Sequence, residues 1–194
     1  LLDELGTLSD PGRAEANRGL IEQTIPDKVS LDLLLQVLKL LLDEQVSVRN
    51  FQLILEAIAE TRGQGHSADA ICEHVRQRLG FQLVAAMRRD DGTIPLVHLA
   101  SDWEKRFSEC EVANDRGAPD VALPPKDFET LSKRIADELA KASGKGIYPA
   151  LVAPGRRRRF LRSILTAKGI NNPVMAFEEI GLEAKPALVG TIPV

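Results

Sequence analysis

The chain has 194 residues, of which 44% are hydrophobic and 27% charged, a balance that excludes collagen-like, disordered and membrane-spanning classes. Its 25 Lys and Arg and 28 Asp and Glu give a net charge of -3, so no overall basic field points to nucleic acid or an anionic membrane. Cys72 and Cys110 lie far apart and form no CxxC motif. This predicts a reducing compartment and cysteines that pack as small hydrophobes, without a disulfide scaffold or zinc site.

The first residues resemble the end of a subdomain in a longer protein. The sequence begins at Leu1 without a methionine, and Pro11-Gly12 soon breaks a helical pattern. We expect a fragment in which residues 1–25 end an upstream subdomain. No apolar run approaches the roughly 20 residues that span a bilayer, and the basic start of a signal peptide is missing. The expected location of the fragment is cytoplasmic.

Residues 26–80 carry the spacing of three helices joined by short loops. Ser30, Ser47 and Ser67 are the expected N-caps of these helices. The first helix is apolar on most sides, so it lies centrally in a bundle or touches a second chain. The core of this helical subdomain is predicted to contain Leu34, Leu38, Leu41, Phe51, Ile54 and Ile58.

From Phe81 the apolar residues alternate, and after the turn at residues 90–92 an extended pattern resumes through Leu99, which predicts a β-hairpin. Ser101 and Glu104 have the spacing of a capping box at the start of a short helix. An exposed loop is expected over residues 111–123.

Residues 125–143 then predict a helix that ends at Gly144. The remaining chain predicts a strand over 147–152, a helix over 155–168, and strands over 174–177 and 187–192. The expected fold is α+β: an all-helical subdomain at 26–80 followed by a small α/β layer subdomain at 81–194.

No motif points to catalysis or to a bound group. Residues 63–68 match the letters GxGxxA, but a helix precedes them where the dinucleotide fingerprint needs a strand. His66, His74 and His98 lack the i, i+4 spacing that pairs imidazoles over a metal. A hydrolase using His98 or Cys110 would lack a second catalytic group at useful spacing. We therefore expect no catalytic residues, no cofactor and no metal.

One run of charge is unusual. Residues 145–194 hold eight Lys or Arg but three Asp or Glu, and four of the cations are consecutive, Arg156, Arg157, Arg158 and Arg159. At a helix start they could hold a phosphate or steer an acidic partner. The interpretation that we favour is a solvated helix face on which the stem of Arg159 packs. The helix dipole disfavours cations there, which keeps the functional interpretation open.

Two groups of segments resemble a known family. The first is Ile25-Pro26-Asp27-Lys28-Val29-Ser30-Leu31, Gln36-Val37-Leu38-Lys39-Leu40-Leu41, Glu44-Gln45-Val46-Ser47-Val48-Arg49-Asn50 and Ile54-Leu55-Glu56-Ala57-Ile58-Ala59. The second is Tyr148-Pro149-Ala150-Leu151-Val152, Arg159-Phe160-Leu161-Arg162, Pro173-Val174-Met175-Ala176-Phe177-Glu178-Glu179-Ile180 and Val189-Gly190-Thr191. Together they resemble the cytoplasmic region of the type III secretion export-gate proteins, the FHIPEP family, in flagella or virulence systems. The family's wording near residues 44–50 is EGVSIRD, so Val48 and Asn50 depart from it, as does Ala176 further on.

This resemblance implies the C-terminal part of a bacterial inner-membrane protein whose cytoplasmic domains form a ring, generally of nine subunits. The ring would receive export substrates, their chaperones, gatekeeper or stalk proteins and parts of the ATPase complex. The resemblance implies neither an enzyme nor a nucleic-acid binder, and contact with the membrane only through the absent N-terminal half. The alternative is an anion-binding or nucleic-acid-binding helical domain that uses the run at residues 156–159.

Arg49 is the strongest candidate for a contact with another surface. With Ser47 as N-cap, the side chain of Arg49 would point outward from the first helical turn, where the helix dipole disfavours a cation. A bidentate bond to a carboxylate of another subdomain or subunit would explain an arginine at this position. The alternative is a surface arginine without a partner. The candidate partner or ring interface is Val46, Ser47, Val48, Arg49, Asn50, Arg156, Arg157 and Arg158.

Overall fold

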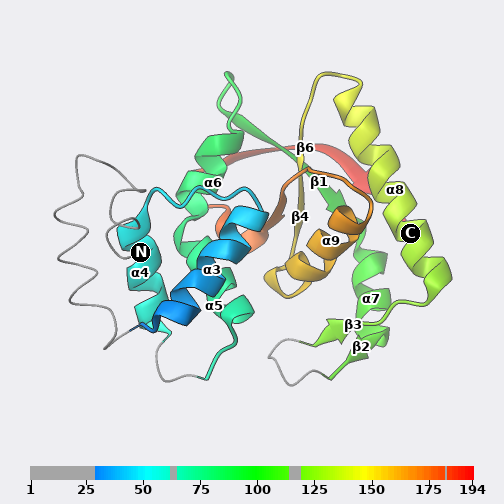
Figure 1. Cartoon of the computed structure of the whole chain (residues 1–194). Helices are drawn as coiled ribbons and strands as arrows, with labels where there is room; N and C mark the ends of the chain where they lie inside the picture. Colours follow the sequence, from blue (N-terminus) through cyan, green and yellow to red (C-terminus); the bar gives the residue numbers. More distant parts are fainter. Residues whose placement is uncertain (1–28, 62–64, 114–118, 182) are drawn as a thin grey trace. The chain divides into compact units, whose positions relative to one another are not determined.

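The computed structural model describes residues 29–61, 65–113, 119–181 and 183–194, and the chain divides into two compact units (Figure 1). The first unit ends at Leu79 and the second begins at Gly80. The upstream subdomain expected at residues 1–25 and the start of the GxGxxA match lie outside the described residues. The fold is α+β, and every strand that the structure describes lies in the second unit.

The described part of the first unit contains three helices, α3 (Leu31–Asp43), α4 (Phe51–Glu60) and α5 (Ala68–Arg78), and α5 packs against both others. Two of the predicted caps are confirmed. The hydroxyl of Ser30 accepts a hydrogen bond from the Leu33 amide, and that of Ser67 accepts one from the Ala70 amide, both at 3.3 Å. Each bond satisfies a backbone donor that the first helical turn leaves free.

All six predicted core residues of this unit are at most 7% exposed, so the prediction is confirmed. Among the helices lies a buried ion pair. The guanidinium of Arg76, on α5, is 3% exposed and lies 3.2 Å from the carboxylate of Glu44, the C-cap of α3. This pair fixes the end of α3 against α5.

The prediction that Ser47 caps the second helix is wrong. α4 begins at Phe51, and its N-cap is Asn50. Ser47 instead accepts a hydrogen bond at 3.4 Å from the Arg49 amide, two residues on, and so closes a local turn. Serine makes both bonds readily, and the sequence alone does not decide between a turn and a helix cap.

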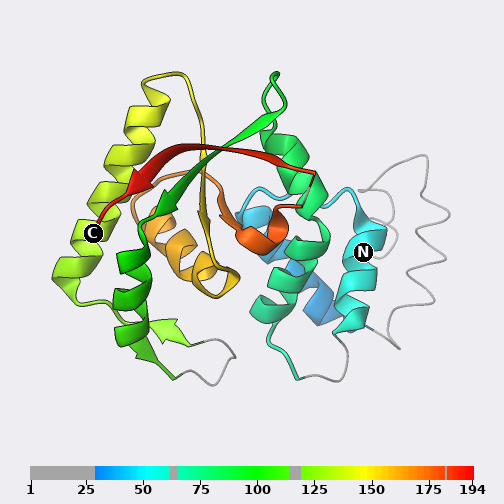
Figure 2. The same cartoon turned by 180° about the vertical axis from the view of Figure 1, so that it is seen from behind.

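A four-stranded parallel sheet organises the second unit. Its strands are β1 (Thr93–Leu99), β4 (Ala150–Ala153), β5 (Val174–Ala176) and β6 (Lys185–Ile192), in the order β5-β4-β1-β6. Figure 2 shows β6, in red, alongside β1, in green. At the β6 edge the register with β1 shifts after Leu96, so that Leu96 pairs with Leu188 but Val97 with Gly190. A short antiparallel pair, β2 (Glu111–Val112) and β3 (Asp120–Val121), occupies the segment predicted as a loop.

Helices cover both faces of this sheet. The larger core cluster joins Val97, Leu151 and Val174 to α7 (Ser101–Glu109), α8 (Pro125–Ser143) and α9 (Gly155–Ala167). The smaller cluster joins Ile94, Val152 and Met175 to α6 (Gly80–Met87). Because both faces are buried, β4 and β5 are continuous apolar runs, as parallel strands usually are.

The predicted β-hairpin over residues 81–99 is wrong in its first half. Residues 80–87 form α6, and the strand β1 then pairs with β4 and β6 in parallel. The alternating residues Leu83 and Met87 also lie four apart, as do Gly80 and Val84, so the same letters give a helix one buried face. The predicted turn exists, because Gly92 adopts a φ of 80° between α6 and β1.

A short 3-10 helix, η2 (Phe177–Glu179), separates β5 from β6. It packs against α6, where the backbone of Glu179 lies close to Gly80. A β-carbon on Gly80 would collide with the backbone carbonyl of Glu179, so this contact requires glycine.

Candidate functional site

The connection between α3 and α4 exposes part of the predicted interface. Val46 is buried and anchors the connection, whereas the side chains of Ser47 and Arg49 are exposed and those of Val48 and Asn50 half-buried. Among the described residues no carboxylate pairs with the guanidinium of Arg49. The surface offered to another protein therefore consists of residues 47–50, with Val46 beneath it.

The four consecutive arginines begin α9 and divide between two environments. Arg156 and Arg159 are exposed, whereas Arg157 and Arg158 are each 1% exposed. The expectation of a solvated helix face is therefore wrong for the two middle arginines, and the packing of the Arg159 stem stays a prediction. Their role in a partner or ring interface stays a prediction, and exposure favours Arg156 for it.

Arg157 lies at the centre of a charged network. Its Nη2 atom donates to the carboxylates of Glu104 at 2.8 Å and Glu111 at 2.5 Å, and its Nε donates to Glu104 at 3.1 Å. The guanidinium also lies 5.8 Å from the ring centre of Phe107. Arg156 donates to the same Glu104 carboxylate at 2.6 Å. Two arginines and two carboxylates thus balance one another within the unit.

The charge of Arg157 is secured by these partners. Burial acts to lower the pKa of its guanidinium, but hydrogen bonds and charge from Glu104 and Glu111 outweigh it, so the pKa is raised above its ordinary value. The predicted capping box of Ser101 and Glu104 is wrong. α7 begins at Ser101 with Ala100 as N-cap and no side-chain cap, because the carboxylate of Glu104 faces the arginines.

Helical periodicity contains a signal for the buried arginines that the charge count misses. Arg157 and Arg158 precede the buried Leu161 by four and three residues, and Leu165 follows four residues later. Residues at these spacings share one face of a helix. The two carboxylate partners of Arg157 lie 46 and 53 residues away, on other elements, so no local pattern indicates them.

The N-terminus of α9 already holds an anion from this chain. The carboxylate of Glu178, in η2, accepts a hydrogen bond from the amide of Gly155, the first residue of α9, at 3.1 Å. Its negative charge lies where the helix dipole is positive and offsets the nearby cations. This helix start therefore resembles an anion site that an internal carboxylate occupies.

A pocket of about 170 Å³ opens near the carboxyl ends of β1 and β4. Apolar side chains line most of it, and His98, Glu104 and Arg157 add polar groups. His98 lies at hydrogen-bonding distance, 2.9 Å, from the hydroxyl of Thr191. Phe177, which is 52% exposed, also borders it.

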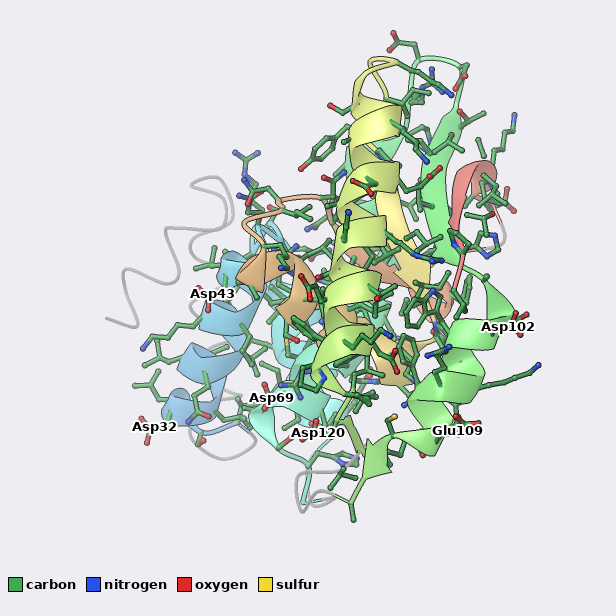
Figure 3. All side chains as sticks on the ribbon, turned by 90° about the vertical axis from the view of Figure 1, so that its right-hand side faces the viewer. Asp32, Asp43, Asp69, Asp102, Glu109 and Asp120 are labelled. Carbon is green, nitrogen blue, oxygen red and sulfur yellow. The ribbon has the colours of Figure 1, made fainter. Side chains whose placement is uncertain are left out.

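Acidic side chains project from the surface of both units. Figure 3 shows Asp102 and Glu109 at the two ends of α7, and Asp32 and Asp43 at the two ends of α3.

Within the described residues, no three His, Cys, Asp or Glu side chains are arranged to hold a metal ion. Cys72 is buried and Cys110 half-buried, and neither forms a disulfide. None of the helices described is both long and apolar enough to cross a bilayer.

Comparison with known proteins identifies relatives among flagellar biosynthesis proteins and among translocation proteins. The flagellar biosynthesis protein FlhA of Caulobacter vibrioides is 32% identical over 180 residues, which are 92% of this chain and 25% of the relative. The probable translocation protein y4yR of Sinorhizobium fredii is 25% identical over 181 residues, 93% of this chain and 26% of the relative. The chain spans about a quarter of the length of these curated relatives.

Solved structures share the fold. A nonameric SctV-C from EPEC aligns with a TM-score of 0.77 at 19% identity and covers 99% of this chain and 57% of its own. The CdsV protein of Chlamydia pneumoniae, in a complex with CdsO, aligns with a TM-score of 0.75 at 20% identity over 99% of this chain and 55% of its own. The model of the FHIPEP family matches residues 2–185, and the chain therefore belongs to the FHIPEP family of type III export-gate proteins.

Proposed function

We propose that this chain is part of a cytoplasmic, ring-forming docking platform in a type III protein export gate, and that it acts by binding rather than by catalysis. The family match over residues 2–185 carries this proposal. The similarity of the fold to a nonameric SctV-C supports the ring, which we propose to be a nonamer in the complete protein. We place it at the cytoplasmic face of the bacterial inner membrane, attached through the part of the protein that precedes this sequence.

The proposed partners are export substrates with their chaperones, gatekeeper or stalk proteins, and proteins of the ATPase complex. The complex of the similar CdsV with CdsO supports a partner protein of this kind. Within the described residues, the exposed turn at Ser47 and Arg49 supports a contact with a neighbouring subunit, because an exposed guanidinium without a carboxylate partner is available for one.

The arrangement of α9 gives little support to the alternative, an anion-binding or nucleic-acid-binding domain. Such a domain would need exposed cations in the arginine run, but Arg157 and Arg158 are buried, and Arg157 and Arg156 pair with Glu104. Glu178 occupies the amide donor at the start of α9. We therefore do not propose nucleic acid as a partner.

The test compares this 194-residue chain with a longer chain that restores the upstream residues. Purified export chaperones bound to substrates are passed over each immobilised chain, and ring formation by each is measured by mass photometry. We expect rings and chaperone capture from the longer chain. Capture by the longer chain alone would place docking upstream of this sequence. Binding of DNA or RNA that weakens steeply with salt, without rings or chaperone capture, would contradict the proposal.

A further inference from the structure

The guanidinium of Arg157 joins two elements of very different size. On one side it binds Glu104, which belongs to the nine-residue helix α7. On the other side its Nη2 atom binds Glu111, the first residue of the two-residue strand β2. The side chains of Glu104 and Glu111 are each 31% exposed, whereas that of Arg157 is 1% exposed. The charged groups facing this guanidinium are thus Glu104 from α7 and Glu111 from β2, with Arg156 bound to the same Glu104.

The two carboxylates contribute unequally to keeping the buried charge in place. Loss of Glu104 would remove three hydrogen bonds to Arg157 and, among the described residues, the carboxylate partner of Arg156, leaving a buried cation with less compensation. Loss of the bond to Glu111 would leave Arg157 paired with Glu104, beside the hydroxyl of Ser108 at 3.4 Å. Because a buried charge costs more without a partner than with one, the Glu111 bond is the one that breaks more easily.

The β2-β3 pair is itself a marginal structure. Each strand has two residues, and the side chain of Val112, which is 51% exposed, adds little packing. The pair is closed by a backbone hydrogen bond of 2.9 Å from the Ala122 amide to the Cys110 carbonyl, and Val121 packs partly against the core. An isolated two-stranded pair has little stability in water, so its attachment to α9 through Glu111 carries much of its order.

We propose that Arg157 is a latch that is fixed to α7 through Glu104 and releases the β2-β3 pair at Glu111. When the latch opens, the two short strands separate from α9 while the four-stranded sheet and its helices stay folded. The proposal concerns contacts within the second unit and goes beyond the docking function, so its failure would leave that function standing.

Amide hydrogen exchange of the 194-residue chain, followed by NMR at neutral pH, tests the latch. The reporter is the Ala122 amide, with amides of β1 and β4 as the reference for the sheet. In Glu111→Gln we expect Ala122 to exchange faster by about tenfold, with the sheet amides and the melting temperature unchanged. The matched control is Glu109→Gln, which removes a carboxylate at the exposed end of α7 (Figure 3) and should leave Ala122 unchanged.

Two further variants separate a latch from a purely structural ion pair. Glu104→Gln should lower the melting temperature of the whole unit, and Glu111→Asp, whose carboxylate is shorter, should give an intermediate exchange rate at Ala122. Unchanged exchange at Ala122 in Glu111→Gln would overturn the proposal. Equal acceleration at Ala122 and in β1 would also overturn it, because Glu111 would then support the whole unit.

Discussion

The amide nitrogen of Val46 lies 2.9 Å from the carbonyl oxygen of Leu41, and this bond closes the carboxyl end of α3 over Gln45. The Gln45 amide bonds the Leu42 carbonyl at 2.9 Å, so the two bonds form a Schellman motif. Gln45 accordingly adopts a φ of 58°, a left-handed conformation that glycine favours. The family wording EGVSIRD has glycine at this position, and this chain bears a conformational cost there.

Replacing Gln45 with glycine should relieve that cost. We expect Gln45→Gly to raise the free energy of unfolding by about 0.5 to 1 kcal/mol, because the steric gain exceeds the greater freedom of glycine in the unfolded chain. Urea denaturation followed by circular dichroism measures it. Gln45→Ala is the control, since alanine keeps the β-carbon and should give no gain.

Two leucines on α3 provide a matched test of the first core. Leu38 is 7% exposed and Leu42 is 56% exposed. We expect Leu38→Ala to cost about 2 to 5 kcal/mol of unfolding free energy, through lost burial and a residual cavity. Leu42→Ala should change it by less than about 0.5 kcal/mol. Equal effects of the two substitutions in chemical denaturation would show that Leu42 is buried by a contact outside the described residues.

Thr93 controls the ionisation of Asp91. The Asp91 carboxylate accepts hydrogen bonds from the Thr93 hydroxyl at 2.6 Å and the Thr93 amide at 2.8 Å, and these lower the pKa of Asp91 below its ordinary value of 3.8. Thr93→Val keeps the branched shape and the amide but removes the hydroxyl. We expect the pKa of Asp91 to rise towards 3.8 in this variant, as followed by carboxyl carbon NMR.

The same carboxylate gives stability a defined dependence on pH. Because the pKa is lower in the folded state, the contribution of Asp91 is complete above about pH 3.8 and is lost as the pH falls through the folded-state value. The urea midpoint of Asp91→Asn should therefore fall less steeply than that of the original protein below this pH. Parallel curves for the two proteins would show that Asp91 does not differ between folded and unfolded states.

Arg49 tests the proposed interface. We expect Arg49→Ala in the full-length protein to leave the melting temperature of the cytoplasmic part unchanged, while ring formation and export of a reporter substrate weaken by about tenfold, the loss expected for one charge-assisted pair. Lys39→Ala removes an exposed cation from α3 and is the matched control. Normal rings and normal export in the Arg49 variant would remove Arg49 from the interface. Unfolding would assign it a structural role.

Local sequence patterns correctly predicted the elements whose ends carry residues that favour the start or the end of a helix. α8 spans Pro125–Ser143 as predicted, because proline favours a first helical turn and Gly144 follows its end. The start of α4 was predicted incorrectly because Ser47 bonds an amide two residues on, and no local pattern distinguishes this turn from a cap. α6 was predicted as a strand because its apolar residues satisfy both spacings, and only the sheet that it covers decides between them.

The candidate surfaces were less predictable because their charges act across the fold. A run of four arginines predicts exposure, yet Arg157 is buried because Glu104 and Glu111 reach it from distant segments. Glu178 likewise reaches the start of α9 from 23 residues further along the chain. The exposure of Arg49 was expected from a helix that starts after Ser47, but α4 begins at Phe51, so Arg49 is exposed on the preceding turn and the helix-dipole argument does not apply to it.

The edge of the sheet at β6 has a consequence for how copies of this protein behave when crowded. An edge strand carries unpaired backbone groups that another strand can join, and Leu188, which is 60% exposed, would favour such joining. Pro186 offers no amide hydrogen, Lys185 adds charge, and the register shift with β1 leaves Val189 without a partner opposite. These three features disfavour continuous strand pairing between crowded copies at the β6 edge.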